Sequence, residues 1–127
     1  MNQYVSTFIA AGAFAIGAVM FTGPAVAAEE TWKDGVMFVQ EELTPVEGHG
    51  VFKIIFGLEP GKCTDEITSV SEVLIMREGT MIQTYPGKAD MSRNKGDEWY
   101  QANGTKVVVC NKSSANAILE GVQFRPM

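Results

Sequence analysis

Residues 72–111 read EVLIMREGTMIQTYPGKADMSRNKGDEWYQANGTKVVVCN, a series of short apolar runs separated by turn-forming residues. Val73-Leu74-Ile75 and Val107-Val108-Val109 are typical of β-strands, because branched side chains favour an extended backbone. Gly79 and Gly96 stand between such runs, where the chain must reverse, and glycine tolerates the positive φ of tight turns. The stretch therefore predicts antiparallel strands joined by short turns.

The same pattern continues on both sides of this stretch. Apolar residues after residue 28 do not recur with sustained helical spacing, and Gly, Pro, Asn and Asp punctuate the chain about every 8 to 12 residues. We expect strands at Gly35–Gln40, Val51–Leu58, Glu66–Ser69, Ser71–Arg77, Thr80–Tyr85, Glu98–Gln101, Lys106–Cys110 and Ala117–Phe124. Short strands at this spacing favour an all-β sandwich or a small barrel.

The segment Met1–Ala28 differs from the rest of the chain because it contains no charged side chain. Val5–Phe21 is apolar and predicts a hydrophobic helix, Gly23-Pro24 would end it, and Ala25-Val26-Ala27 has the small residues of a cleavage site. A secretory signal peptide is favoured, although the usual basic residue near its start is missing; the alternative is a retained membrane anchor. Both options place residues 29–127 outside the cytoplasm, as a periplasmic, secreted or membrane-anchored domain.

Composition limits the function classes. The 127 residues include 10 Lys and Arg against 15 Asp and Glu, a net charge of −5, and 46% of them are hydrophobic, which fits one compact domain at 29–127. An acidic chain lacks the basic surface that displaces counterions from a phosphate backbone, so nucleic acid is excluded as a main partner. The single histidine, His49, excludes metal sites built on two or more imidazoles. His49 itself lies in Glu47–Gly50, where we expect a solvated flexible turn.

Three local patterns resemble the conserved blocks of the cupin superfamily of small jelly-roll β-barrels. Leu58-Glu59-Pro60-Gly61 is similar to the turn that opens the ligand-bearing strand of that family. Glu72, followed after six residues by Gly79, resembles the end of the first block, and Gly96–Asn111 resembles the second block. The resemblance spans residues 36–124 and implies a small cupin-like jelly-roll barrel.

The resemblance also implies a metal centre, but the ligands are missing. A cupin centre uses two histidines, a glutamate and a third histidine to hold a transition metal. Counting from either end of the first block puts Ile67 with Ser69 or Asp65 at the histidine positions, and Val107 replaces the third histidine. Glu72 alone remains, and one carboxylate does not hold a transition metal against water. We therefore expect no metal, no cofactor and no metal-dependent catalysis.

The two cysteines, Cys63 and Cys110, predict a disulfide if the domain is exported to an oxidising compartment. In the jelly-roll topology that the resemblance implies, the strand after Pro60-Gly61 pairs antiparallel with Lys106–Cys110. The family register sets Ile67 opposite Val107, which places Cys63 beside Cys110 with an offset of one residue.

The barrel interior that the resemblance implies would form a pocket with Glu72 as its main polar group. We expect its lining to comprise Ile67, Ser69, Glu72, Leu74, Met76, Val107 and Val109, and such a pocket suits a small, largely apolar ligand.

The favoured function is therefore an exported, non-catalytic binding or accessory protein, with no catalytic residue. One version is an accessory subunit that docks on a membrane complex and is anchored by the N-terminal segment. The alternative is a cupin enzyme, either a metal-dependent oxygenase or isomerase, or a metal-free enzyme with Glu72 as general acid or base. Apolar runs such as Ile54-Ile55-Phe56 also favour a homodimer, in which a second subunit covers the outer face of the barrel.

Overall fold

The computed structural model describes residues 29–127, and these residues form β-strands with no helix among them. No segment of residues 29–127 is therefore a helix of the length and hydrophobicity needed to cross a membrane. The predicted signal peptide or anchor, with its helix, falls in residues 1–28, outside the described residues. The strands are β1 (Trp32–Lys33), β2 (Val36–Val46), β3 (His49–Leu58), β4 (Ile67–Thr68), β5 (Ser71–Glu78), β6 (Thr80–Thr84), β7 (Met91–Asn94), β8 (Glu98–Gln101), β9 (Lys106–Cys110) and β10 (Ala117–Pro126).

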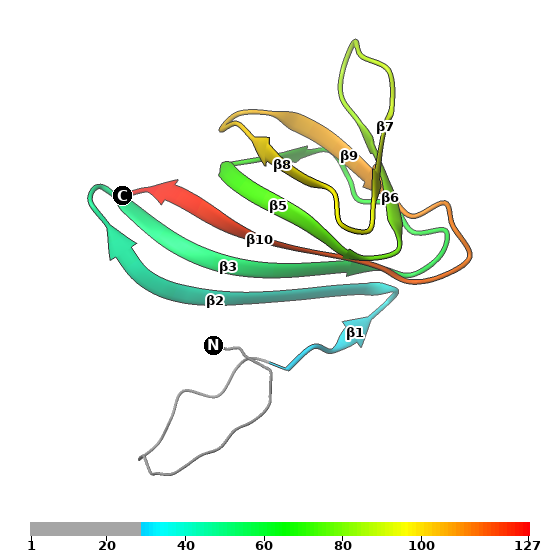
Figure 1. Ribbon diagram of the computed structural model, residues 1–127, viewed down its shortest axis with the longest axis horizontal. Coiled ribbons are helices and arrows are strands. Elements are labelled where there is room, and N and C mark those ends of the chain that lie inside the picture. The colour runs from blue at the N-terminus through cyan, green and yellow to red at the C-terminus, as the bar shows by residue number, and fades with distance from the viewer. Residues whose placement is uncertain (1–28) are drawn as a thin grey trace.

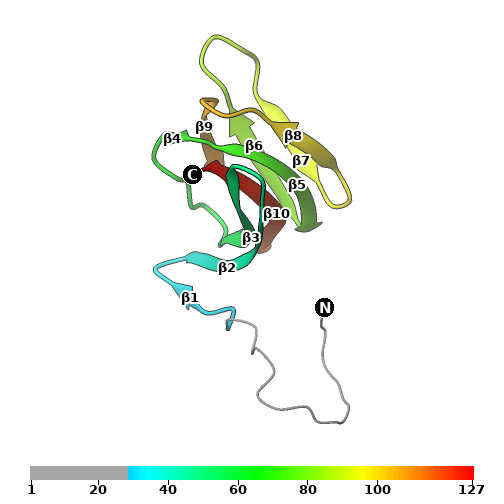
Figure 2. The same cartoon turned by 90° about the vertical axis from the view of Figure 1, so that its left-hand side faces the viewer.

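The strands form two antiparallel sheets. The larger has six strands in the order β1-β2-β3-β10-β5-β8, and the smaller has four in the order β4-β9-β6-β7. β10, the last strand in the chain, lies inside the larger sheet, where Leu119 pairs with both Phe56 of β3 and Met76 of β5. In Figures 1 and 2, β1 and β2 lie at the bottom of the domain, and β6, β7 and β9 lie above them. This arrangement confirms the predicted all-β jelly-roll barrel.

Most strand positions agree with the predicted runs, and β8 and β9 have the predicted bounds. β2 extends past the predicted end at Gln40 to Val46, because its polar second half lies on an exposed edge rather than in a loop. β1 and β7 were not predicted, since both are short and contain no β-branched residue. The turn expected over Glu47–Gly50 is present but shorter: the chain reverses at Glu47-Gly48, where Gly48 has φ 75°, and His49 lies in β3 rather than in the turn.

The core lies between the two sheets. Along β5 the side chains alternate, so that Glu72, Leu74 and Met76 are buried while Val73 and Ile75 are exposed on the outer face. Each sheet contributes residues to one buried cluster, which consists of Ile54, Leu58, Leu74, Met76, Met81, Val107, Val109, Ala117 and Leu119. The interior is therefore apolar except where Glu72 and its neighbours enter it.

A second, smaller cluster forms on the outer face of the larger sheet. Met37, Val39 and Ile118 are buried there and pack against Trp32 of β1. The indole fits because Gly57 has no side chain: a Cβ at Gly57 would come within 2.6 Å of the Trp32 ring. The short strand β1 is thus held mainly by its aromatic side chain.

An ion cluster fastens the residues that precede β1. The Arg77 guanidinium contacts both carboxylate oxygens of Glu30, at 2.8 and 3.0 Å, and one oxygen of Glu120 at 3.0 Å. The hydrogen bond from Arg77 holds the pKa of Glu30 below its usual value. The first described residues are therefore attached to the outer face of β5 and β10.

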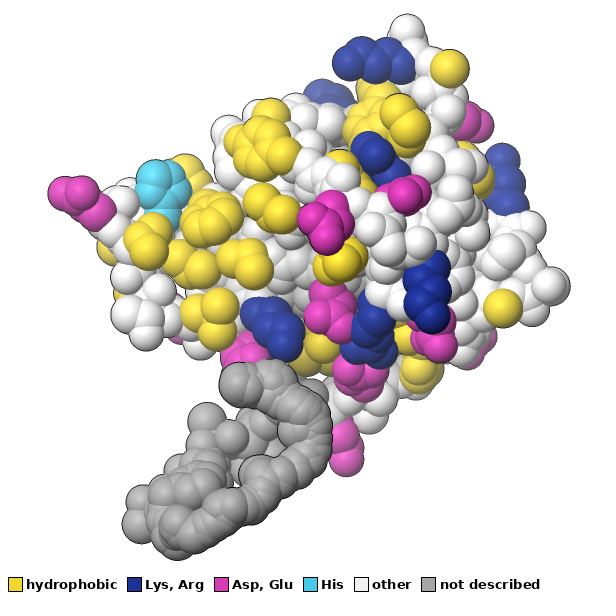
Figure 3. Space-filling model, in the orientation of Figure 1, with side chains coloured by type: hydrophobic (Ala, Val, Ile, Leu, Met, Phe, Trp, Pro, Cys, Tyr) yellow, Lys and Arg dark blue, Asp and Glu magenta, His cyan; other side chains and the backbone are white. Residues whose placement is uncertain are grey.

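The rest of that outer face carries exposed apolar side chains. Val73 and Tyr100 are cross-strand partners on β5 and β8, and 49% and 63% of their surfaces are exposed. Leu43 on β2 is also exposed and pairs with Val51 of β3. Figure 3 shows hydrophobic side chains gathered beside the single histidine, His49. The predicted homodimer and the predicted docking on a membrane complex stay predictions.

The two cysteines form the disulfide that the resemblance implied, Cys63 with Cys110. Cys63 and Cys110 face each other in an isolated antiparallel bridge, and Ile67 pairs with Val107 in the β4–β9 ladder. The expected offset of one residue between bridge and ladder is therefore confirmed. The disulfide keeps the two-residue strand β4 beside β9.

Candidate functional site

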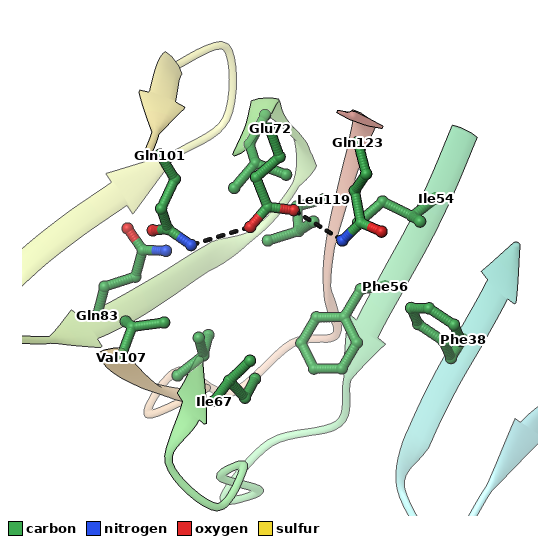
Figure 4. A pocket seen from close by; sticks show the side chains of 12 residues that line it. Phe38, Ile54, Phe56, Ile67, Glu72, Gln83, Gln101, Val107, Leu119 and Gln123 are labelled. Carbon is green, nitrogen blue, oxygen red and sulfur yellow. Dashed lines mark hydrogen bonds between the residues drawn. The ribbon is translucent and has the colours of Figure 1, made fainter. Parts of the chain in front are cut away.

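Between the two sheets the barrel contains an open cavity of about 340 Å³ (Figure 4). Most of its wall is apolar and consists of Phe38, Ile54, Phe56, Ile67, Leu74, Val107, Val109 and Leu119. Its polar groups are one carboxylate and three amides, from Glu72, Gln83, Gln101 and Gln123. Figure 4 shows Glu72, Gln101 and Gln123 together on one side, with Ile67, Phe56 and Phe38 across from them.

Most of the residues that were expected to line a pocket do border this cavity, namely Ile67, Glu72, Leu74, Val107 and Val109. Ser69 and Met76 do not border it. Met76 faces the same interior as Glu72 and Leu74, but it lies further along β5, where it is 1% exposed in the packed core beside Met81 and Ala117. The Ser69 hydroxyl donates a hydrogen bond to the carbonyl of Ala102, 3.1 Å away.

The lining residues that sequence reasoning missed come mainly from β2, β3, β6, β8 and β10. The most important are Gln101 and Gln123, because they contact Glu72. Gln101 and Gln123 are the cross-strand partners of Glu72 on its two sides, so the three side chains form one row across β8, β5 and β10. The alternation of side chains along each strand could be predicted from the sequence. The order of the strands in the sheet, which brings these three side chains into one row, could not.

Glu72 is a buried carboxylate held by two amides. Its side chain is 5% exposed, its Oε2 accepts a hydrogen bond from Nε2 of Gln101 at 2.9 Å, and its Oε1 accepts one from Nε2 of Gln123 at 2.9 Å. Burial raises the pKa of Glu72 above its usual value, and the two amide hydrogen bonds offset part of that rise. In residues 29–127 no Lys or Arg forms an ion pair with Glu72.

Two arginines stand behind the amides. Arg125 donates hydrogen bonds to Oε1 of Gln123 through Nε and Nη2, and its guanidinium lies 4.0 Å from the centre of the Phe52 ring. Arg93 donates from Nε to Oε1 of Gln83 at 2.7 Å and stacks over Trp99. The two guanidinium groups thus do not line the cavity themselves. Each contacts a glutamine side chain that does.

Tyr85 connects the amides on the other side of Glu72. Its hydroxyl lies 3.0 Å from Oε1 of Gln101 and 2.7 Å from Oε1 of Gln83. Because the amide oxygen of Gln101 is directed at this hydroxyl, its Nε2 is directed at Glu72. The Gln101 amide therefore links the Tyr85 hydroxyl to the Glu72 carboxylate.

The mouth of the cavity lies between the edges of the two sheets. Phe38 on β2 and Ile67 on β4 are 55% and 39% exposed, whereas Leu74, Val107 and Leu119 are buried deeper in the barrel. At the far side, Gly121 of β10 lies under Leu74, and a Cβ there would collide with the Leu74 side chain and with the Val73 carbonyl. Because glycine has no side chain, the Leu74 side chain can pack directly against the backbone at Gly121.

A metal of the kind that such barrels hold does not fit these residues. The positions that the resemblance assigned to imidazoles carry Ile67 and Val107, which have no donor atom. The amide oxygens of Gln101 and Gln123 are turned away from Glu72 toward Tyr85 and Arg125. Residues 29–127 contain no group of three His, Cys, Asp or Glu side chains arranged to bind a metal ion. We therefore derive no metal chemistry at this site.

Comparison with known proteins identifies the fold. No family model and no curated protein matches the sequence. A Cupin 2 conserved barrel domain protein from Salinispora arenicola superposes with a TM-score of 0.61 at 17% identity, covering 85% of this chain and 90% of that one. An RmlC-like cupin from Methanocaldococcus jannaschii gives 0.59 at 24% identity, covering 82% and 94%. The cupin domain of an XRE family transcriptional regulator from Enterobacter cloacae gives 0.52 at 20% identity, covering 71% and 97%.

These similarities confirm that residues 29–127 have the cupin fold, as the sequence blocks implied. Proteins of this fold differ in function, as a domain within a transcriptional regulator illustrates. The function of this chain must therefore be argued from its own cavity.

Proposed function

We propose that residues 29–127 act outside the cytoplasm as a non-catalytic binding module for a small molecule. The ligand would place an apolar body against the aliphatic and phenyl walls of the cavity and a polar head group against Glu72. One observation carries the proposal: a buried carboxylate, held by two amides, lies at the side of a largely apolar cavity of about 340 Å³. Such a volume with a few convergent polar groups is typical of small-molecule sites.

A metal-free enzyme is the second candidate, and the raised pKa of Glu72 favours it. Burial tunes carboxyl groups toward general acid or base function in the same way. The two candidates differ in one measurable respect, because an enzyme converts its bound ligand and a binding module returns it unchanged. Mass spectrometry of a ligand recovered after prolonged incubation with the protein separates them.

We expect Ile67→Trp to block the mouth of the cavity and to weaken small-molecule binding at least about tenfold, which is about 1.4 kcal/mol. Ile67 lines the mouth and is 39% exposed, so a larger side chain there can be accommodated without repacking the core. The measurement is a titration followed by amide NMR shifts, using a panel of neutral, cationic and anionic fragments with an apolar body.

Ile75→Trp is the matched control for this experiment. Ile75 is 38% exposed, almost the same as Ile67, but its side chain lies on the outer face of β5 away from the cavity. This variant should bind the same fragments as the unchanged protein. Equal weakening by both variants, or no fragment that shifts the cavity residues, would contradict the proposed function.

Export is the second part of the proposal. The paired cysteines suit an oxidising compartment, and the apolar segment before Glu29 suits a signal peptide. We expect the protein recovered from its native cell to have lost residues 1–27 or 1–28, as measured by intact mass. An uncleaved chain in the membrane fraction would support an anchored accessory subunit instead, and an uncleaved chain in the cytosol would refute export.

A further inference from the structure

We propose that the ligand of this cavity carries a protonated amine, which forms an ion pair with ionised Glu72. This inference rests on the proposed function, since it names the chemical class of the molecule that the cavity binds. Three features of the site support it: the donors that surround Glu72, the lack of an ion pair between Glu72 and any Lys or Arg of residues 29–127, and the aromatic walls.

The first feature is that the hydrogen bonds around Glu72 suit its ionised form. Each carboxylate oxygen accepts one amide N–H, from Gln101 and Gln123. The Gln123 amide cannot reverse, because the Arg125 guanidinium contacts its Oε1 and a guanidinium only donates. Nε2 of Gln123 therefore always faces Glu72. Two amide donors, one of them fixed by Arg125, are complementary to a carboxylate, which only accepts.

The second feature is that, among residues 29–127, no Lys or Arg forms an ion pair with Glu72. Its side chain is 5% exposed and most of the cavity wall is apolar. Arg125 acts on Glu72 only from behind Gln123, where its donors contact Gln123 and Gln40. Keeping an ionised carboxylate in such surroundings is costly unless a cation pairs with it. The cavity supplies the space in which a ligand cation can lie.

The third feature is the pair of phenyl rings across the cavity from Glu72. Phe38 and Phe56 border the same space, and Figure 4 shows both rings on the side opposite the carboxylate and its amides. Phenyl rings pack against an aromatic or aliphatic body and also attract a nearby cation through their faces. A molecule with an apolar body and one ammonium group matches both sides of the cavity, whereas an anionic head group would be repelled by Glu72.

The test compares three probes of similar shape and different charge: 2-phenylethylamine, 2-phenylethanol and 3-phenylpropanoate. Calorimetric or NMR titration at neutral pH should show that the amine binds at least about tenfold more tightly than the alcohol, and that the carboxylate does not saturate the site. In Glu72→Gln the preference for the amine should disappear while the alcohol still binds. Glu98→Gln, which removes one charge from the outer edge strand β8, should keep the preference.

The pH dependence gives an independent readout. Glu72 has a raised pKa, so its ionised fraction increases as the pH rises through that value, while the amine stays protonated up to about pH 9. The affinity for the amine should therefore increase with pH over this range, and the affinity for the alcohol should stay constant. Equal affinity for amine and alcohol would overturn this inference and leave the proposed function standing. Binding of none of the three probes would overturn the inference and count against the proposed function.

Discussion

Replacement of Cys63 and Cys110 together by alanine is expected to lower the free energy of unfolding by about 4 kcal/mol. The disulfide joins residues separated by 47 positions, and the chain-entropy model gives about 4 kcal/mol for closing a loop of that length. For a domain of this size the melting temperature should fall by roughly 15 to 30 °C. Chemical and thermal denaturation of the two proteins measure the difference.

Removal of the disulfide should also affect ligand binding in the cavity. β4 is held in its sheet by the pairing of Ile67 with Val107 and of Thr68 with Lys106, and the disulfide lies just beyond these pairs. Ile67 borders the mouth of the cavity, so the double variant should bind the fragment panel more weakly as well.

A reductant provides the control. It should lower the stability of the unchanged protein to that of the double variant and leave the double variant unaffected. A difference in unfolding free energy below about 1 kcal/mol between the oxidised protein and the double variant would contradict the prediction.

We expect Gly79→Ala to cost about 3 kcal/mol of stability or more, measured by denaturant unfolding. Gly79 connects β5 to β6 with φ 74°, a left-handed conformation that costs a residue with a side chain about 1 to 2 kcal/mol. A Cβ at this position would also collide with the backbone carbonyl of Asn116 and lie 2.9 Å from Cα of Ala117. Backbone atoms cannot turn aside as a flexible side chain can, so the segment that leads into β10 must shift.

Gly104→Ala separates the two causes. Gly104 has φ 87°, but a Cβ there would meet nothing within 4 Å, so the substitution imposes only the conformational cost of about 1 to 2 kcal/mol. The difference between the two variants measures the steric clash at Gly79. Equal losses in both variants would show that the close contact with Asn116 contributes nothing.

The fold could be predicted well because each strand carries a local signal. Runs such as Val107-Val108-Val109 favour strands, and the glycines at Gly79 and Gly96 have the positive φ that was expected of turn residues. The strands that escaped prediction lack that signal: β1 is held by the packing of Trp32 over Met37, and β7 by pairing with β6. The Trp32 indole also packs at Gly57, far along the chain, and β7 is a strand through its pairing with β6 rather than through its own residues, so no local pattern contains either signal.

The cavity was harder to predict than the fold. Glu72, Leu74, Ile67, Val107 and Val109 could be named because the resemblance assigned their strands to the barrel interior. The glutamines were not named, since a glutamine is usually an exposed residue and its role here depends on register. Gln101 and Gln123 donate hydrogen bonds to the Glu72 carboxylate only because β8 and β10 pair with opposite edges of β5.

Gly121 links the shape of the cavity to the packing of the sheet behind it. This residue does not border the cavity, yet the Leu74 side chain that rests on it does. A larger residue at position 121 would push Leu74 toward the ligand and shorten the space available to it. Its Cβ would also come within 2.7 Å of the Val73 carbonyl oxygen, so the backbone next to Glu72 would have to shift. Variants at this single position should therefore shorten the molecule that the protein accepts and weaken the pairing of β10 with β5 at the same time.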